Sequence, residues 1–481
     1  MRPVALALGL IIAAGAVVHS FTADVIQIRS DDILLMTASR EVDAGAWRRL
    51  WAPQHIHFLP LYRLARLAFD LHFPAWHRGF HGLIVSTHLA GALLLFQIAQ
   101  RYLRSPWAAL TVALLFSGSM VGSEALTWKA ASPFVFSWTL LLAGLSCLRR
   151  QGRAWRAAAA AALLCGVGFF SGVLFVLPGI VLATKLLEPA AARRALWLAA
   201  AVGATGLLAW TAFVAPQTDL AHYWTHAAPT TPLATRLAGA AADTGRAYLH
   251  QLLVGTLVRS RPALAAAFLL LLGFLIFLVR RQLNGRLILA GFLLTAPLLL
   301  AMLFIRKEPG VEQIGRYAYQ GYTLWAIVLG ALLDAILQSW PRRRTAVLTI
   351  LPVLAAGYLA GHGWIGWQDR EAFRRQPAAW AAFWRGWDSF LRLASAGRAA
   401  GSRPLVVPHF ELRPGLHLAT VYGLCHPRGL PGLVVYDRAS TAGELEEFWQ
   451  EVAAARERSS LFRQVELPRP SLTGAADSVY H

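Results

Sequence analysis

The sequence predicts an all-α polytopic membrane protein of about eleven transmembrane helices, with a small α/β appendage at the C-terminal end. Hydrophobic residues make up 57% of the 481 residues and charged residues only 15%. The apolar residues come in runs long enough to cross a bilayer. Arginines gather in short segments between these runs, which is how membrane proteins encode orientation. The formal net charge of +20 therefore indicates topology and a lipid bilayer as partner, and no nucleic acid.

Eleven apolar segments are expected to form the spans. They cover 3–21, 79–99, 106–122, 131–148, 157–170, 172–186, 195–215, 262–279, 287–305, 321–339 and 345–363. Between Arg156 and Lys185 lie 28 residues, which would measure about 42 Å as one helix at 1.5 Å per residue. This exceeds the ~30 Å hydrocarbon core. Basic loops on both of its sides require the chain to return to the same face. We therefore predict two short or re-entrant spans, broken between Phe169 and Gly172.

The orientation follows from the charge of the connections. Short arginine-rich connections alternate with longer ones of mixed charge, and the positive-inside rule places the basic set in the cytoplasm. The segments 22–78, 123–130, 216–261 and 306–320 and the C-terminal tail then face outward. The first apolar segment lacks a small-x-small cleavage site and is interpreted as an uncleaved anchor. This predicts a bacterial inner-membrane protein with a cytoplasmic N-terminus and a periplasmic C-terminal domain.

Two parts of different character are expected. Residues 1–363 would form the transmembrane module and residues 364–481 a small periplasmic domain. An amphipathic helix with tryptophans on one face opens the second part, and the runs "PLVVPHFE" and "GLVVYD" are typical of strands. Three cysteines do not make a disulfide framework.

The first outward segment holds two adjacent carboxylates, Asp31 and Asp32, in a chain with few acidic residues. A carboxylate can act as a general base, and a second one beside it can orient a substrate or raise the pKa of the first. The plainer alternative is that the pair caps the helix that begins near Ile33. We expect catalysis by Asp31 or Asp32.

Cationic, histidine and tyrosine side chains are predicted on the same outward face, where they suit a phosphorylated substrate that approaches from the bilayer. The candidates for binding its phosphate are Arg316, Lys129, Tyr317, Tyr319, His55, His57 and Arg63. The candidates for the acceptor side are Glu124, His222 and His226. Interface anchoring is the alternative for the arginines and tyrosines. The two histidines of "QHIHF" lack a clear third ligand, so no metal and no cofactor is expected.

These segments resemble the GT-C superfamily of polyprenyl-phosphate-sugar glycosyltransferases. "HFLPLYRLARLAFD", "FHGLIVSTHLAGALLLFQIAQRYL", "GSEALTWKAASPFVFSWTLLLAGL" and "GRYAYQGYTLWAIVLGALL" are similar in order to protein O-mannosyltransferases that carry tetratricopeptide repeats. The resemblance implies a polyprenyl-phosphate-linked sugar donor and an aspartate of the first outward loop as general base. It also implies that Arg316, Tyr317 and Tyr319 lie near the donor phosphate. The segment 364–481 lacks a 34-residue helical repeat, so the acceptor is left open among glycan, lipid and protein.

Two other readings stay open. An O-antigen-type ligase or polymerase that uses polyprenyl-diphosphate glycans would rely on arginines of a large outward loop, and 216–261 holds Arg236, Arg246, Arg259 and Arg261. A lipid or polysaccharide transporter or flippase would carry ionisable residues within its spans or an inverted repeat. The predicted spans are almost free of charge, with His88 as the main polar exception, which weakens this second reading.

Overall fold

The chain divides into two compact units in a computed structural model. The larger unit comprises Met1–Gln27 and Leu50–Glu371, and the smaller one comprises Ile28–Arg49 and Ala372–His481. The structure describes residues 2–22, 35, 39, 42, 45, 47–51, 57–70, 77–217, 233–255, 262–305, 315–375, 406–409 and 434–437.

The larger unit is built from helices. The α-helices are α1 (Arg2–Ser20), α3 (Pro60–Asp70), α4 (His77–Tyr102), α5 (Pro106–Ser117), α6 (Ser123–Thr127), α7 (Pro133–Leu148), α8 (Arg153–Phe169), α9 (Leu177–Leu187), α10 (Pro189–Phe213), α12 (Leu233–Gly255), α13 (Pro262–Val279), α14 (Gly285–Ile305), α15 (Gly315–Ser339) and α16 (Arg344–Arg375). Short 3₁₀ turns join some of them: η2 (Lys129–Ala131), η3 (Ser171–Val176), η4 (Ala215–Gln217) and η6 (Pro341–Arg343). A further 3₁₀ turn, η1 (Trp47–Leu50), belongs to the smaller unit except for Leu50.

Length and composition support a membrane protein. Among the residues that the structure describes, five helical segments are long and apolar enough to cross a bilayer: Gly79–Tyr102, Lys129–Leu148, Pro189–Phe213, Tyr319–Ser339 and Pro341–Gln368. Shorter apolar helices lie at Leu6–Ser20, Pro106–Ser117, Ser171–Leu187, Ala265–Val279 and Gly285–Ala301. The prediction of a mostly helical membrane protein is thus supported, whereas eleven spans stays a prediction.

The helix break expected between Phe169 and Gly172 is confirmed. Helix α8 ends at Phe169, Phe170 takes an extended conformation, and η3 leads into α9. The break also receives the chain that enters α3, because the backbone N–H of Phe58 donates to Ser171 Oγ at 3.1 Å. An interrupted helix thus provides the hydroxyl that anchors a neighbouring segment.

Two segments differ from the sequence prediction. Helix α5 ends at Ser117, five residues before the predicted end of its span, and the following segment 118–132 is mostly buried. Within the predicted outward loop 216–261 lies the helix α12. Its Tyr248 hydroxyl bonds Thr295 Oγ1 at 2.6 Å, and Trp325 Nε1 donates to the Tyr248 carbonyl at 2.6 Å. This helix packs on α14 and α15, and these two helices provide the hydrogen-bond partners of its polar groups.

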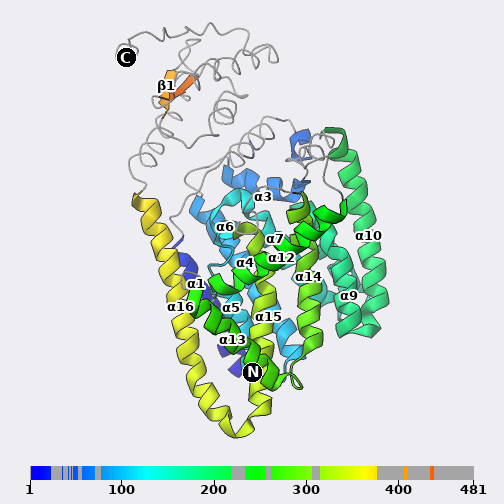
Figure 1. The fold of residues 1–481 in the computed structure, drawn as a ribbon. Helices are drawn as coiled ribbons and strands as arrows, with labels where there is room; N and C mark the ends of the chain where they lie inside the picture. The colour runs from blue at the N-terminus through cyan, green and yellow to red at the C-terminus, as the bar shows by residue number, and fades with distance from the viewer. Residues whose placement is uncertain are drawn as a thin grey trace. The chain divides into compact units, whose positions relative to one another are not determined.

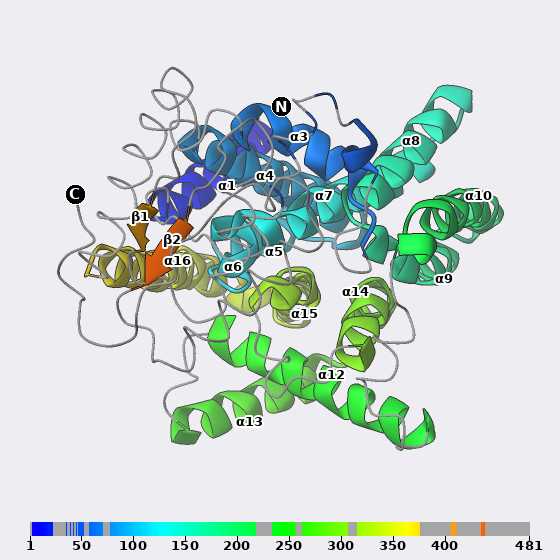
Figure 2. The same cartoon turned by 90° about the horizontal axis from the view of Figure 1, so that it is seen from above.

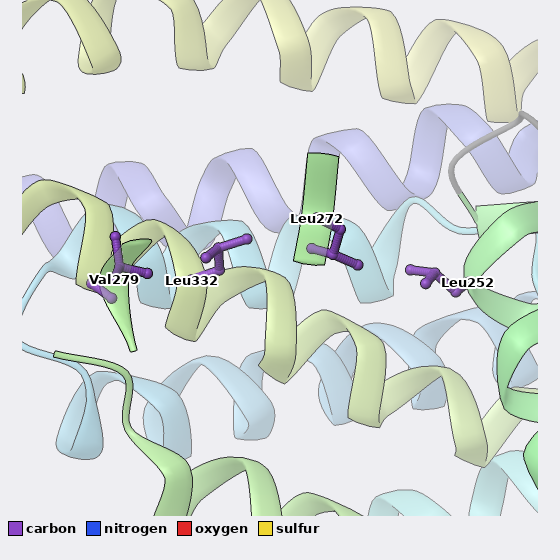
Figure 3. Close-up of a cluster of buried hydrophobic side chains, with 5 residues drawn as sticks. Leu252, Leu272, Val279 and Leu332 are labelled. Atoms are coloured by element: carbon purple, nitrogen blue, oxygen red, sulfur yellow. The ribbon is translucent and has the colours of Figure 1, made fainter. Parts of the chain in front are cut away.

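Helix α15 lies between two groups of helices. Figure 2 shows α12 and α13 on one side of α15, and α5 and α6 on the other. Side chains of α12, α13 and α15 form a buried apolar cluster, drawn in Figure 3. Its members are Leu252, Leu272, Val279, Leu332 and Ala335. On the far side of α5, α16 runs beside α1 (Figure 1), where Gly366 approaches the carbonyl of Val18.

The two ends of α5 are capped by side chains from other helices. At its beginning, the carboxylate of Asp334 in α15 accepts hydrogen bonds from the backbone N–H groups of Arg104 (3.3 Å) and Ser105 (2.7 Å). A carboxylate at a helix N-terminus satisfies orphan N–H groups and complements the helix dipole. These hydrogen bonds at the start of α5 account for the burial of the Asp334 carboxylate.

At the other end of α5, histidines and a tyrosine satisfy carbonyls that have no helical partner. His19 Nε2 and His88 Nε2 donate to the Ser117 carbonyl at 2.9 and 3.2 Å. The Tyr358 hydroxyl donates to the Leu115 carbonyl at 2.7 Å. An apolar environment offers no water to these carbonyls. The end of this short helix therefore needs hydrogen-bond donors from the side chains of neighbouring helices.

The smaller unit contributes two described strands. β1 (Val406–His409) and β2 (Val434–Asp437) pair in parallel, with Val406 opposite Val434. They lie in the two runs with strand character, "PLVVPHFE" and "GLVVYD". The tryptophans on which the expected amphipathic helix rests lie outside the described residues.

Candidate functional site

The segment between α5 and α7 folds back onto α15 through one close contact. Gly122 has φ +78° and ψ 16°, a left-handed conformation that suits glycine. A Cβ at this position would lie 2.5 Å from Cα and 2.7 Å from N of Tyr319. Glycine therefore lets the start of α6 touch the α15 backbone, which brings α6 next to the first turn of α15.

This contact pairs two charged residues from the predicted site. The backbone N–H of Arg316 donates to Glu124 Oε2 at 3.2 Å, and Arg316 Nη1 lies 3.6 Å from Glu124 Oε1. The Arg316 guanidinium also lies over the Trp128 ring, 4.7 Å from its centroid. Both charged side chains are largely buried, with 12% and 16% exposed. The carboxylate caps α15 and fixes the position of the arginine.

Lys129 lies in the next turn, where α3 reaches the same segment. The Tyr62 hydroxyl of α3 donates to the Lys129 carbonyl. Ser132 Oγ donates to the same carbonyl at 2.8 Å and lies 3.1 Å from the Tyr62 hydroxyl. The Lys129 side chain itself is buried, with 7% of the residue exposed. Tyr62 thereby joins α3 to the segment that carries Glu124 and Lys129.

Helix α3 turns its arginines inward and a leucine outward. Arg63 and Arg66 are 8% and 1% exposed, whereas Leu64 is 50% exposed. The Arg66 guanidinium lies 6.0 Å from the ring centroid of Tyr62. Burial of a guanidinium is costly unless an anion or several acceptors surround it. The inward face of α3 therefore suits contact with anionic groups, and its outward face suits lipid.

The predicted residues fall into three groups. Glu124 pairs with Arg316, whereas Lys129 and Arg63 are buried nearby in η2 and α3. The Tyr319 hydroxyl bonds His88 Nδ1 at 2.9 Å, and the His57 ring lies 4.9 Å from the ring of Phe170. Outside the described residues lie Asp31, Asp32, His55, His222, His226, Arg259, Arg261 and the side chain of Tyr317.

Tyr62 and Arg66 were not predicted as site residues from the sequence. In "HFLPLYRLARLAFD" they are four residues apart and hence on one face of the helix. Their alternation with leucines is a signal that could have been used. The same spacing, however, is equally typical of arginines that reach toward solvent from an interfacial helix. The direction in which the face points is visible only in the structure.

The arrangement offers basic groups and a paired carboxylate, but no described metal centre. No group of three or more His, Cys, Asp or Glu side chains that could hold a metal ion occurs within the residues described. Arginine and lysine side chains can bind a phosphate without a metal. The site is thus suited to an anionic headgroup.

No protein-family model matches this sequence, and the comparisons with curated proteins and with solved structures found no match.

Proposed function

We propose that this chain is an integral-membrane glycosyltransferase. It transfers a sugar from a polyprenyl-phosphate-linked donor, on the periplasmic side, to a glycan, lipid or protein acceptor. The observation that supports the proposal is the set of buried basic side chains on α3, η2 and the first turn of α15. These are Arg63, Arg66, Lys129 and Arg316. A phosphate at the head of a lipid is an anion that reaches such groups from the bilayer.

In the proposed reaction, the acceptor hydroxyl loses its proton to a carboxylate while its oxygen attacks the anomeric carbon. The bond between that carbon and the phosphate oxygen breaks, and the lipid phosphate leaves with the bonding electrons. We assign the base to Asp31 or Asp32, on the sequence argument alone. The basic side chains would stabilise the charge that grows on the leaving phosphate. Attack opposite the leaving group inverts the configuration.

The test is transfer by the purified full-length chain in proteoliposomes, with a panel of polyprenyl-phosphate and polyprenyl-diphosphate sugars. We expect transfer from a monophosphate donor and a loss of at least about 100-fold in kcat with Asp31→Asn or Asp32→Asn, because general-base catalysis contributes typically 10²–10⁴-fold. Asp243→Asn is the matched control, since Asp243 pairs with the exposed Arg246 on α12.

Arg66→Gln tests the basic face. We expect a KM for the donor raised about tenfold or more, the effect of losing one charge-assisted bond. Leu64→Gln on the outward face of α3 should leave KM unchanged. Full activity in both aspartate variants would contradict the assigned base. Failure of every donor in the panel would overturn the proposed function, and use of diphosphate donors alone would move it to a ligase or polymerase.

A further inference from the structure

A second feature of the larger unit lies away from the candidate site, between α4, α7, α9, α14 and α15. A cavity of about 620 Å³, including its open mouth, is lined mainly by apolar side chains of these helices. Examples are Leu95, Leu142 and Leu294.

One end of the cavity carries charge. Glu188 Oε1 lies 3.0 Å from Arg149 Nε and 3.1 Å from Arg101 Nε, and it accepts a hydrogen bond of 2.8 Å from the Tyr102 hydroxyl. Arg149 and Glu188 line the cavity. Two guanidinium groups share one carboxylate, so this end is net positive. Burial lowers the pKa of Arg149 from its usual value, but the guanidinium stays charged in any physiological range.

Two lining residues of the cavity have buried polar atoms. Trp138 and Thr323 line the cavity and are 1% and 3% exposed. Trp138 Nε1 and Thr323 Oγ1 have no hydrogen-bond partner among the described residues. An acyl chain offers no hydrogen bond to these two atoms, so they do not bear on the kind of guest.

The depth of the cavity identifies the kind of guest. Trp138 and Arg149 are eleven residues apart and both line it, which corresponds to about 16 Å along α7 at 1.5 Å per residue. That is about half of the ~30 Å hydrocarbon core, the depth of one leaflet. An apolar cavity of this depth with cations at one end matches one acyl chain below an anionic headgroup.

We propose that this cavity binds one acyl chain of an anionic glycerophospholipid, whose phosphate lies at Arg149 and Arg101. The inference is independent of glycosyl transfer, because none of its residues belongs to the candidate donor site. The acyl chain would fill the space between the five helices that line the cavity and would contact all of them. It would therefore act as a structural part of the membrane unit.

The test uses the purified full-length chain in nanodiscs of phosphatidylcholine with and without phosphatidylglycerol, followed by native mass spectrometry in a neutral detergent. We expect the wild-type chain to retain phosphatidylglycerol. Leu294→Trp fills the cavity and should abolish this retention. Leu289→Trp is its control on α14, since Leu289 is 47% exposed and does not line the cavity.

A second pair of variants tests the headgroup. Arg149→Gln should weaken retention of phosphatidylglycerol about tenfold, the effect of losing one charge-assisted bond, and should leave phosphatidylcholine unchanged. Arg156→Gln, on the exposed start of α8, should have no effect. Equal retention of both lipids by the wild-type chain would overturn the proposal. So would equal retention by Leu294→Trp and Leu289→Trp, or by Arg149→Gln and Arg156→Gln.

Discussion

Replacing Gly122 with alanine should be among the most destabilising single-methyl additions in the larger unit. Two costs add at this position. A left-handed backbone costs a residue with a Cβ about 1–2 kcal/mol, and Gly122 has φ +78°. The new Cβ would also lie 2.5 Å from the Tyr319 Cα and 2.7 Å from its N. Backbone atoms cannot rotate away, so overpacking adds about 1–3 kcal/mol. The expected total is about 2–5 kcal/mol.

The assay is the free energy of unfolding, measured by titrating the protein in mixed micelles with a denaturing detergent. Two further glycines separate the costs. Gly152 has φ +110°, but a Cβ there would lie 4.0 Å from its nearest neighbour in space, Trp155 Cδ1. Gly152→Ala therefore measures backbone strain alone, about 1–3 kcal/mol. Gly239 lies within α12 with nothing within 4 Å of a Cβ, so Gly239→Ala should stabilise by about 0.5–1 kcal/mol.

We attribute the cost of Gly122→Ala beyond that of the left-handed backbone to the contact with Tyr319. A cost for Gly122→Ala below about 1 kcal/mol would refute it, because both the left-handed backbone and the approach to α15 would then be wrong. A cost of only about 1–2 kcal/mol for Gly122→Ala, that of the left-handed backbone by itself, would refute the close approach alone.

Two smaller effects follow from the helix caps. Glu124→Ala should cost about 1–3 kcal/mol, since it removes the acceptor of the Arg316 N–H and the partner of its guanidinium. Glu124→Gln keeps an acceptor and should lose less; equal stability of the alanine variant and the wild type in the same titration would contradict the cap. Tyr358→Phe removes the hydroxyl that donates to the Leu115 carbonyl, so the unfolding free energy should fall by about 1–3 kcal/mol. An unchanged value would show that the α5 terminus does not depend on this bond.

Local patterns in the sequence were sufficient for most helices. Apolar runs and the basic segments between them located the helices, because a helix in an apolar environment satisfies its own backbone and needs only a suitable length. The break after Phe169 could be predicted because one continuous helix of that length would not fit the bilayer. The early end of α5 at Ser117 could not be predicted, because its carbonyls are satisfied by His19 and His88, which belong to other helices.

The candidate site was predictable in its residue types and only partly in its partners. Composition and spacing indicated that Glu124 and Arg316 belong to polar segments on one side of the protein, but assigned them to different roles. The structure pairs them although they are 192 residues apart in the sequence. Such a pairing depends on how α6 packs against α15, which a local pattern does not encode.

By itself, the sequence determined the class of protein, the places of its helices and the chemical types available for binding an anion. These are local properties, set by hydrophobicity, helical periodicity and charge. Only the tertiary structure decided which polar groups meet. It turned Arg63 and Arg66 of α3 inward, placed Asp334 at the start of α5 and left an apolar cavity beside Arg149. Each of these depends on the packing of helices that are distant in sequence, since a buried polar group takes its partner from whichever helix packs against it.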